Sequence, residues 1–274
     1  MWWIDGRRTD RLPATDRGLH YGDGLFETMA VVDGEIRHLR LHLDRLREGL
    51  RRLRIPAGVA RGLDTQLRRY AHGQPRAVLK LIVTRGDGRR GYAPPVDAQP
   101  RTLVQRTDWP DWPRSHASRG VAVRVCSTRL GTRPGLGGIK HLNRLEQVLA
   151  RGEWRNRRWQ EGLMLDCSAR VVCGTMSNIF AVRGGVVLTP DVGDRGVAGV
   201  MRAVIRREAP RAGLQVEVVD GLTLDGIAAA DECFVSNALV GVWPVRRIGA
   251  LQLGAPGPVT RRLQAWLTEG GHIG

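Results

Sequence analysis

The order in which helical and strand-like periodicities follow one another constrains the fold of this 274-residue chain more than any single motif does. Five leucines recur between residues 39 and 53 at steps of four and three, which predicts one apolar helix face that ends before Pro56. Strand-like runs lie on either side, at residues 27–32 and 77–84, and a block of short strand-like runs fills residues 162–188. Because helices and strands do not alternate regularly, the pattern predicts an α+β fold with mixed sheets.

A proline-containing stretch without periodicity divides the chain. It covers residues 108–120 and reads DWPDWPRSHASRG, which is typical of a linker. We therefore expect a small N-terminal α/β domain at residues 1–108, a linker at 109–119 and a larger C-terminal domain at 120–274. A second helix of the N-terminal domain is expected at residues 59–70.

Charge and cysteine content narrow the class of protein. The net charge is +16 and the pI is about 11.3, but the arginines are scattered and no nucleic-acid-binding motif is present, so an anionic small molecule is the better-supported partner. No apolar run reaches the length of a membrane span, and the first residues lack the order of a signal peptide. The four cysteines have no zinc-site spacing. We expect a cytoplasmic protein without a membrane partner, specific nucleic acid or metal site.

Lys140 is unusual for this chain. Lys80 and Lys140 are its only lysines among 43 lysine and arginine residues. A lysine that serves as a surface charge can be replaced by arginine, whereas a lysine that forms a Schiff base cannot, because guanidinium stays protonated. Lys140 lies in a glycine-rich loop before an amphipathic segment, so amine chemistry is a stronger reading for it than for Lys80, which alternates with leucines on a strand. Chance retention of both lysines stays open.

Two other segments could hold a phosphate-bearing cofactor. A glycine-containing turn at residues 196–199 leads into a helix that begins near Val200, and helix N-termini bind phosphate through their amides. Ser177 and Asn178 are polar in an otherwise apolar pair of strands. The same turn also occurs as an ordinary strand-to-helix connection, so the pattern alone leaves both uses open. Together with a reactive lysine, it fits pyridoxal phosphate, which joins an aldehyde to a phosphate.

Five motifs in this order resemble one family. They are HYGDGLFET (20–28), HLDRL (42–46), the lysine segment, GTMSNIF (174–180) and GVAGVMR (196–202). The set resembles the fold-type IV pyridoxal-phosphate enzymes and covers nearly the whole chain. The resemblance implies the two-domain architecture of that family, with a small N-terminal α/β domain and a larger C-terminal domain built on a mixed, β-barrel-like sheet. It also implies a pyridoxal 5'-phosphate cofactor and a homodimer.

Two segments carry a narrower resemblance. KHLNRLEQVLAR (140–151) and RGDGRRGY (85–92) are similar to the aminodeoxychorismate lyases rather than to aminotransferases. This likeness implies a lyase that converts the anionic substrate 4-amino-4-deoxychorismate to 4-aminobenzoate and pyruvate, a step of folate biosynthesis. An aminotransferase of the D-amino acid or branched-chain type is the alternative. A third reading is a protein without enzymatic activity, either an arginine-rich nucleic-acid binder or a cofactor-binding relic.

The resemblance assigns roles to individual residues. Lys140 matches the Schiff-base lysine, which also transfers the proton, and Arg45 matches the arginine that holds the cofactor phosphate. The amides of Val200 and Met201 match the helix terminus that binds this phosphate. The implied cofactor-binding set is Arg45, Lys140, Cys173, Val200, Met201, Ser236 and Asn237. The candidates for contacts with the substrate carboxylates are Tyr21, Arg90 and Tyr92.

Cys173 departs from the family pattern. A glutamate usually precedes the glycine of the GTMSNIF-like segment and pairs with the pyridine nitrogen of the cofactor. A glutamate is ionised at neutral pH, whereas a cysteine thiol is mostly neutral there. We expect a weaker electron sink, which counts against a transaminase more than against a lyase whose product is aromatic, although an altered activity is also open. Asp166 is the only acid that we expect near Cys173, and as a hairpin-turn residue it is not an obvious replacement for the glutamate.

Overall fold

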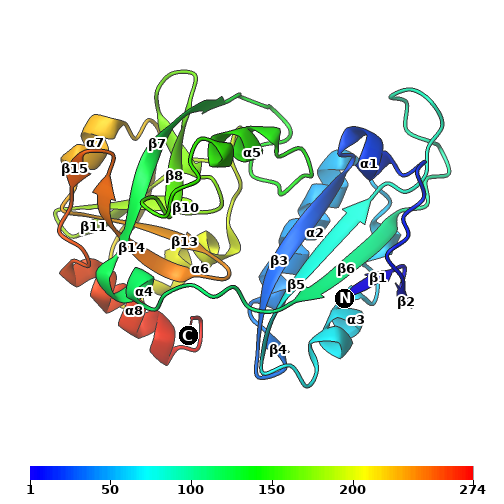
Figure 1. Cartoon of the computed structure of the whole chain (residues 1–274), viewed down its shortest axis with the longest axis horizontal. Helices are drawn as coiled ribbons and strands as arrows, with labels where there is room; N and C mark the ends of the chain where they lie inside the picture. The colour runs from blue at the N-terminus through cyan, green and yellow to red at the C-terminus, as the bar shows by residue number, and fades with distance from the viewer. Residues whose placement is uncertain (274) are drawn as a thin grey trace. The chain divides into compact units, whose positions relative to one another are not determined.

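The leucine-rich segment forms helix α2 (Leu39–Leu53) in the computed structural model, which describes residues 1–273. Leu39, Leu43, Leu46 and Leu50 are buried on one face of α2, as the spacing predicts. The chain divides into two compact units. The N-terminal unit comprises Met1–Pro110 together with Ile139–Arg144, and the C-terminal unit comprises the rest of the described chain. Both units combine helices with a sheet, which confirms the α+β, two-domain prediction (Figure 1).

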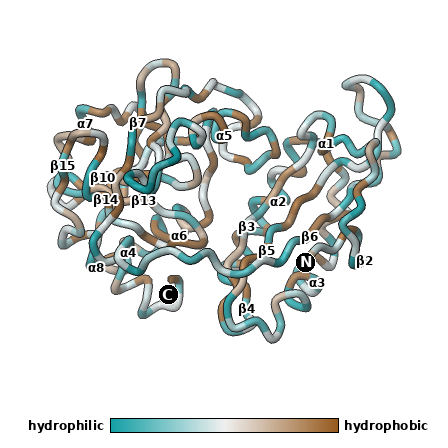
Figure 2. Tube along the Cα trace, in the orientation of Figure 1, coloured by the Kyte–Doolittle hydropathy of each residue, from teal (hydrophilic) through white to brown (hydrophobic). Residues whose placement is uncertain are grey.

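The N-terminal unit is built on a six-stranded antiparallel sheet in the order β2-β1-β6-β5-β3-β4. Its strands are β1 (Trp2–Ile4), β2 (Arg7–Arg8), β3 (Gly24–Val32), β4 (Glu35–Ile36), β5 (Arg76–Thr84) and β6 (Arg101–Thr107). Its helices are α1 (Arg17–Tyr21), α2, the 3₁₀ helix η1 (Ala57–Ala60) and α3 (Leu63–Ala71). Helix α2 packs against β3. Figure 2 shows hydrophobic residues along the central strands β3 and β5, and Met29, Leu79 and Leu81 there are fully buried.

A short segment from the middle of the chain extends this sheet. Residues 139–144 lie beside the first half of β3, where β4 does not reach. The backbone amide of Phe26 donates to the carbonyl of Lys140 at 2.9 Å, and the amide of Leu142 donates to the carbonyl of Gly24 at 3.0 Å. The backbone of Lys140 is therefore fixed to β3 by the same ladder of hydrogen bonds that joins neighbouring strands.

The C-terminal unit is built on a mixed nine-stranded sheet that curls into a half-barrel, as the predicted barrel-like sheet requires. The strands are β7 (Val121–Leu130), β8 (Glu161–Asp166), β9 (Val171–Gly174), β10 (Asn178–Arg183), β11 (Val186–Pro190), β12 (Val216–Val219), β13 (Glu232–Asn237), β14 (Gly241–Ile248) and β15 (Leu251–Gln252). The helices are α4 (Ser115–Arg119), α5 (Leu145–Gly152), α6 (Val200–Glu208), α7 (Leu224–Ala228) and α8 (Pro258–Glu269). Stacked rings of Phe180 and Phe234, 4.7 Å apart, join β10 to β13 in the core.

Several elements differ from the sequence-based expectation, among them one helix and one strand. The helix expected at residues 59–70 is interrupted, because Gly62 adopts a left-handed conformation with φ of 70° between η1 and α3. Strand β14 was not among the expected strands; Pro244 lies inside it, and proline is unfavourable in central strands. Its neighbours β13 and β7 nevertheless pair with it on both sides, so tertiary pairing outweighs the local propensity.

Candidate active site

Lys140 projects its amine over an aromatic ring of the N-terminal unit. Its Nζ lies 4.3 Å from the centre of the Phe26 ring, and the Nζ of Lys80 lies 5.6 Å from the same ring. The two lysines of the chain thus approach one phenyl group from two different segments. Lys80 pairs with Thr28 in the sheet register, which places it on the same face of the sheet as Phe26. The structure gives Lys80 a place beside Lys140 that the sequence pattern did not indicate.

The environment of Lys140 favours a neutral amine. Burial lowers the pKa of Lys140, the nearby Arg45 guanidinium lowers it further, and the Glu27 carboxylate partly opposes both, with a net pKa of about 7. An ordinary lysine is almost fully protonated at neutral pH and does not act as a nucleophile. At a pKa of about 7, a large fraction of Lys140 is unprotonated, as attack on an aldehyde requires.

A buried cluster of Glu27, His42 and Arg45 lies between β3 and α2. Arg45 forms a bidentate ion pair with Glu27, from Nε to Oε1 at 2.8 Å and from Nη2 to Oε2 at 2.5 Å. His42 Nδ1 donates to Glu27 Oε2 at 2.6 Å. Burial raises the pKa of Glu27, but Arg45 and the hydrogen bond from His42 lower it more, to about 2. The carboxylate is therefore ionised and holds the Arg45 guanidinium in one orientation.

Sequence reasoning found Arg45 but missed Glu27 and His42. His42 follows Leu39 by three positions and precedes Leu46 by four, so it lies on the buried leucine face of α2. A polar residue on the apolar face of a predicted helix was the sequence feature that could have pointed to His42. The Nε2 atom of His42 is buried and has no hydrogen-bond partner among residues 1–273. Such an unsatisfied atom is unusual in a protein interior and fits a polar group that arrives with a ligand.

In the C-terminal unit, the predicted helix terminus is present. Helix α6 begins at Val200 with Gly199 as its N-cap, so the amides of Val200 and Met201 lie in the first turn, where no intrahelical partner exists. Asn178 fixes the approach to this turn: its Oδ1 accepts from the amide of Gly199 at 3.1 Å, and its Nδ2 donates to the carbonyl of Val197 at 2.9 Å. A Cβ at position 199 would lie 2.0 Å from that Oδ1, so any other residue there would displace the Asn178 side chain.

Ser236 and Asn237 lie at the end of β13, where Ser236 is directly opposite Asn178 in the sheet. The Ser236 hydroxyl is fully buried and has no hydrogen-bond partner among the described residues. The side chain of Asn237 instead forms hydrogen bonds with backbone groups. Its Nδ2 donates to the carbonyl of Met176 at 3.2 Å, and its Oδ1 accepts from the amides of Leu239 and Val240, each at 2.9 Å. Of this pair, Ser236 has the unsatisfied hydroxyl and Asn237 holds a turn.

Cys173 is buried on β9 among apolar side chains that include Met164 and Trp154. The acid expected nearby, Asp166, is in the hairpin turn: its Oδ1 accepts from the amides of Ser168 and Arg170, both at 2.9 Å. Asp166 is not the only acid near Cys173, which corrects the expectation. A Cβ on the neighbouring Gly174 would lie 2.8 Å from the Glu161 carboxyl carbon.

Glu161 organises the turn that follows Cys173. Its Oε1 accepts from the amide of Gly162 at 2.8 Å and from the amide of Thr175 at 3.0 Å, and it also accepts from the Thr175 hydroxyl. Its Oε2 accepts from Ser177 Oγ at 2.7 Å and from the amide of Met176 at 3.3 Å. All five donors are neutral. No local sequence pattern indicates this role, because Glu161 lies on β8 and the turn lies between β9 and β10.

The three candidate substrate residues are on the surface of the N-terminal unit. Tyr21 ends α1, and its ring centre lies 5.4 Å from that of Tyr92, so the structure brings these two residues together. Tyr92 is 85% exposed, and Arg90 is also exposed in the same loop. The Arg17 guanidinium lies 4.8 Å from the centre of the Tyr21 ring.

The residues present fit the chemistry of pyridoxal phosphate. Its aldehyde needs an unprotonated amine, which Lys140 provides. Its phosphate needs anion-binding groups, and the first turn of α6 provides amides that have no intrahelical partner. The buried, unsatisfied hydroxyl of Ser236 fits a phosphate or ring oxygen acceptor better than it fits an empty interior.

Known proteins similar to this chain cover nearly its whole length. An aminodeoxychorismate lyase of Vibrio harveyi is 36% identical over 267 residues, which are 96% of this chain and 98% of that protein. The crystal structure of 4-amino-4-deoxychorismate lyase from Pseudomonas aeruginosa is 44% identical and superimposes with a TM-score of 0.94, covering 99% of this chain and 100% of that one. A putative branched-chain-amino-acid aminotransferase of Methanocaldococcus jannaschii is 31% identical and covers 96% and 93% of the two chains.

The likeness to the Pseudomonas structure confirms the predicted two-domain fold-type IV architecture. None of the helices among residues 1–273 is long and apolar enough to cross a membrane. Residues 24–248, which include β3, Lys140 and the turn before α6, match the sequence profile of the amino-transferase class IV family. The chain therefore belongs to the class IV aminotransferase family.

Proposed function

We propose that this chain is a pyridoxal-phosphate-dependent lyase that converts 4-amino-4-deoxychorismate to 4-aminobenzoate and pyruvate. The observation that carries the proposal is full-length similarity to two proteins described as this lyase, at 36% and 44% identity. The RGDGRRGY and KHLNRLEQVLAR segments support the same choice within the family. The amine of Lys140, with a pKa of about 7, supplies the reactive group that the reaction needs.

Each side chain has a defined task in this mechanism. Lys140 binds the cofactor aldehyde, and Arg45, held by Glu27, neutralises phosphate charge. The amides of Val200 and Met201 and the hydroxyl of Ser236 donate to the phosphate, while Asn237 fixes the turn beside them. When bound, pyridoxal phosphate would supply an aldehyde for the substrate amine and an electron sink for the carbon next to it.

Lys140 moves the protons. The neutral amine of Lys140 would accept the proton from the amine-bearing ring carbon of the substrate. The electron pair of that C–H bond then expels the enolpyruvyl oxygen, which leaves as pyruvate after protonation, and the ring becomes aromatic. The pKa of about 7 lets Lys140 both accept and return a proton near neutral pH.

Cys173 supports a lyase more than an aminotransferase. Its thiol is buried among apolar side chains, so it does not provide the anion that a glutamate places at this position in the family. Aminotransfer depends on stabilising a carbanion, whereas loss of pyruvate is driven by formation of an aromatic ring. The second candidate is nevertheless an aminotransferase, which the likeness to the Methanocaldococcus protein favours.

Tyr21, Arg90 and Tyr92 contact the substrate in this proposal. Arg90 and Tyr92 are exposed on one loop, and Tyr21 is half-buried at a helix end beside them, so a dissolved ligand can reach the loop. Arg90 provides positive charge for the carboxylates of an anionic substrate, and the paired rings of Tyr21 and Tyr92 provide an aromatic surface for a cyclic one.

The chain acts as a homodimer in the cytoplasm under this proposal. Leu145, Val148 and Leu149 on α5 are 76%, 62% and 63% exposed, which is a large apolar area for one short helix. Sedimentation velocity of the wild type and of Val148→Lys tests the dimer, because a charge on a dimer-forming face dissociates it. The four cysteines are free of disulfide bonds, as in a reducing compartment.

The deciding experiment couples the purified protein to an aminodeoxychorismate synthase and measures 4-aminobenzoate. We expect its formation to depend on pyridoxal phosphate and to disappear in Lys140→Arg. Borohydride reduction followed by peptide mass spectrometry should place the cofactor on Lys140. Amino transfer to an oxo acid without any 4-aminobenzoate would overturn the lyase assignment in favour of the aminotransferase.

A further inference from the structure

The loop that carries Arg90 and Tyr92 has little apolar anchoring of its own. Every residue at positions 89–94 is exposed, so burial of side chains does not fix this loop. It is held instead through its backbone. Arg17 Nη2 donates to the carbonyl of Tyr92 at 2.9 Å, and Nη1 donates to the carbonyls of Gly91 at 3.2 Å and Ala93 at 3.4 Å. One guanidinium therefore binds three consecutive carbonyl groups.

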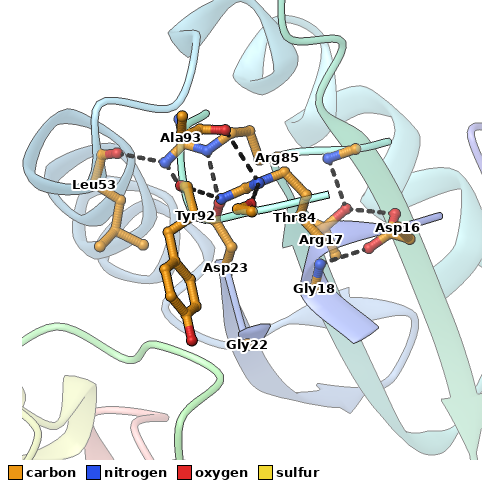
Figure 3. A network of polar contacts seen from close by, with 12 residues as sticks. Asp16, Arg17, Gly18, Gly22, Asp23, Leu53, Thr84, Arg85, Tyr92 and Ala93 are labelled. Atoms are coloured by element: carbon orange, nitrogen blue, oxygen red, sulfur yellow. Dashed lines mark hydrogen bonds and ion pairs between the residues drawn. The ribbon is translucent and has the colours of Figure 1, made fainter. Parts of the chain in front are cut away.

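Arg17 is itself rigidly placed. Its side chain is 5% exposed, and its Nε donates to Asp23 Oδ2 at 2.9 Å. Asp23 also pairs with Arg85, which donates to the carbonyls of Leu53 and Arg54 at the end of α2. Figure 3 shows Arg17 and Arg85 on either side of Asp23, with the ring of Tyr92 pointing away from this cluster. The loop is thereby connected to α1 and α2 through buried charge pairs.

The contact between Arg17 and the loop is close. A Cβ on Gly88 would lie 2.7 Å from both Cγ and Cδ of Arg17, so the loop passes over the arginine stem at a distance that only glycine permits. The Arg17 amide also donates to the carbonyl of Gly86 at 2.9 Å. The same guanidinium lies over the Tyr21 ring at 4.8 Å. Arg17 thus contacts both members of the Tyr21–Tyr92 pair, one through its ring and the other through its backbone.

We propose that Arg17 is a positioning residue for substrate specificity, which holds the 89–93 loop so that Tyr92 pairs with Tyr21 and the two rings receive a cyclic, anionic substrate. This inference rests on the proposed function and deepens it. Arg17 acts on the substrate through Tyr92 and has no contact with the reacting atoms in this account.

Arg17→Gln removes the fork and the charge, and Arg17→Lys keeps the charge but lacks the planar fork that reaches Asp23 and the three carbonyls together. For both variants we expect the KM for 4-amino-4-deoxychorismate to rise about tenfold, because several charge-assisted hydrogen bonds are lost, with kcat within about twofold of wild type. Arg106→Gln is the matched control, since Arg106 also donates to a backbone carbonyl of this unit, that of Tyr70, away from the loop. Its KM should be unchanged.

A double mutant separates positioning from general stability. Tyr92→Ala alone should raise the KM, and Tyr92→Ala added to Arg17→Gln should raise it little further, because both substitutions disable the same contact. Trypsin provides a readout without activity: cleavage after Arg89 and Arg90 should be faster in Arg17→Gln than in Arg106→Gln. The absorbance of the bound cofactor should stay that of wild type.

The outcomes distinguish this inference from the proposed function. A wild type that forms no 4-aminobenzoate overturns the function. If the wild type is active, additive effects of Arg17→Gln and Tyr92→Ala on the KM overturn the positioning role, as does an unchanged KM. A parallel loss of kcat and cofactor binding in Arg17→Gln also overturns it, because that result indicates a purely structural arginine.

Discussion

Glu27 in the N-terminal unit and Glu161 in the C-terminal unit are buried glutamates whose carboxylates are stabilised in different ways. Glu27 and Glu161 are each 1% exposed. Glu27 accepts hydrogen bonds from the charged Arg45 guanidinium and from His42, whereas Glu161 accepts five hydrogen bonds from amides and hydroxyls. The first carboxylate is compensated by charge and the second by dipoles.

Glu27 therefore affects its surroundings through its charge, whereas Glu161 does so through the geometry of its hydrogen bonds. The charge of Glu27 acts on its surroundings, since it fixes Arg45 and partly offsets the lowering of the Lys140 pKa. Glu161 fixes the backbone of the turn after Cys173, and its neutral partners add no charge of their own. The same residue type therefore adjusts an amine in one unit and a loop shape in the other.

The largest expected effect is that of Glu27→Gln. It leaves the Arg45 guanidinium without its buried counter-ion, so we expect a loss of about 3–5 kcal/mol in the free energy of unfolding at pH 7. Because the pKa of Glu27 is lowered from 4.5 to about 2, its stabilisation is complete above pH 4.5 and is lost as the pH falls towards 2. Urea unfolding of the cofactor-free protein across this range measures both. If the difference in the free energy of unfolding between wild type and Glu27→Gln stayed constant down to pH 2, the charge-based account would be contradicted.

Glu161→Gln should cost less. The amide of glutamine turns one acceptor into a donor that faces other donors, which we expect to cost about 2 kcal/mol at pH 7. The same urea titration measures it, with Glu217→Gln on the exposed strand β12 as the control. If Glu161→Gln were as destabilising as Glu27→Gln, the distinction between charge and dipole compensation would be wrong.

The third test concerns the Lys140 amine. In the cofactor-free protein, its reaction with trinitrobenzenesulfonate should increase with pH around a midpoint near 7, because only the unprotonated amine reacts. Glu27→Gln should move this midpoint down, since Glu27 favours the charged amine, and Arg45→Gln should move it up. Glu161→Gln should leave it in place. Peptide mapping of Lys140 and Lys80 separately follows each amine, and a midpoint near 10 for Lys140 would refute the prediction.

The smallest effect on the lyase reaction is expected for Cys173→Glu. An acid at this position should change the lyase rate within about twofold and increase any aminotransferase activity more, because only the latter depends strongly on a protonated ring nitrogen. Cys173→Gln is a control of the same size without the charge. A lyase rate that increases more than the aminotransferase rate would contradict the argument from the electron sink.

Local sequence patterns predicted those structural features that depend on residues close together in the chain. The leucine spacing predicted α2, the glycine-rich turn predicted the start of α6, and the scarcity of lysine drew attention to Lys140. The Glu27–Arg45 ion pair depends on β3 and α2 packing together, and the Glu161 turn depends on pairing between β8 and β9. No local pattern encodes these contacts. The roles assigned to Lys140 and to the other cofactor-binding and substrate residues all stay predictions.

The attachment of residues 139–144 to β3 has a consequence for how this gene could be divided. These six residues belong to the N-terminal unit, although the segments before and after them belong to the other unit. A fragment that stops at Pro110 would contain Glu27, His42 and Arg45 but would lack Lys140 and the backbone that covers the edge of β3. Expression of two separate halves would therefore leave the amine on one polypeptide and the charges that adjust it on the other.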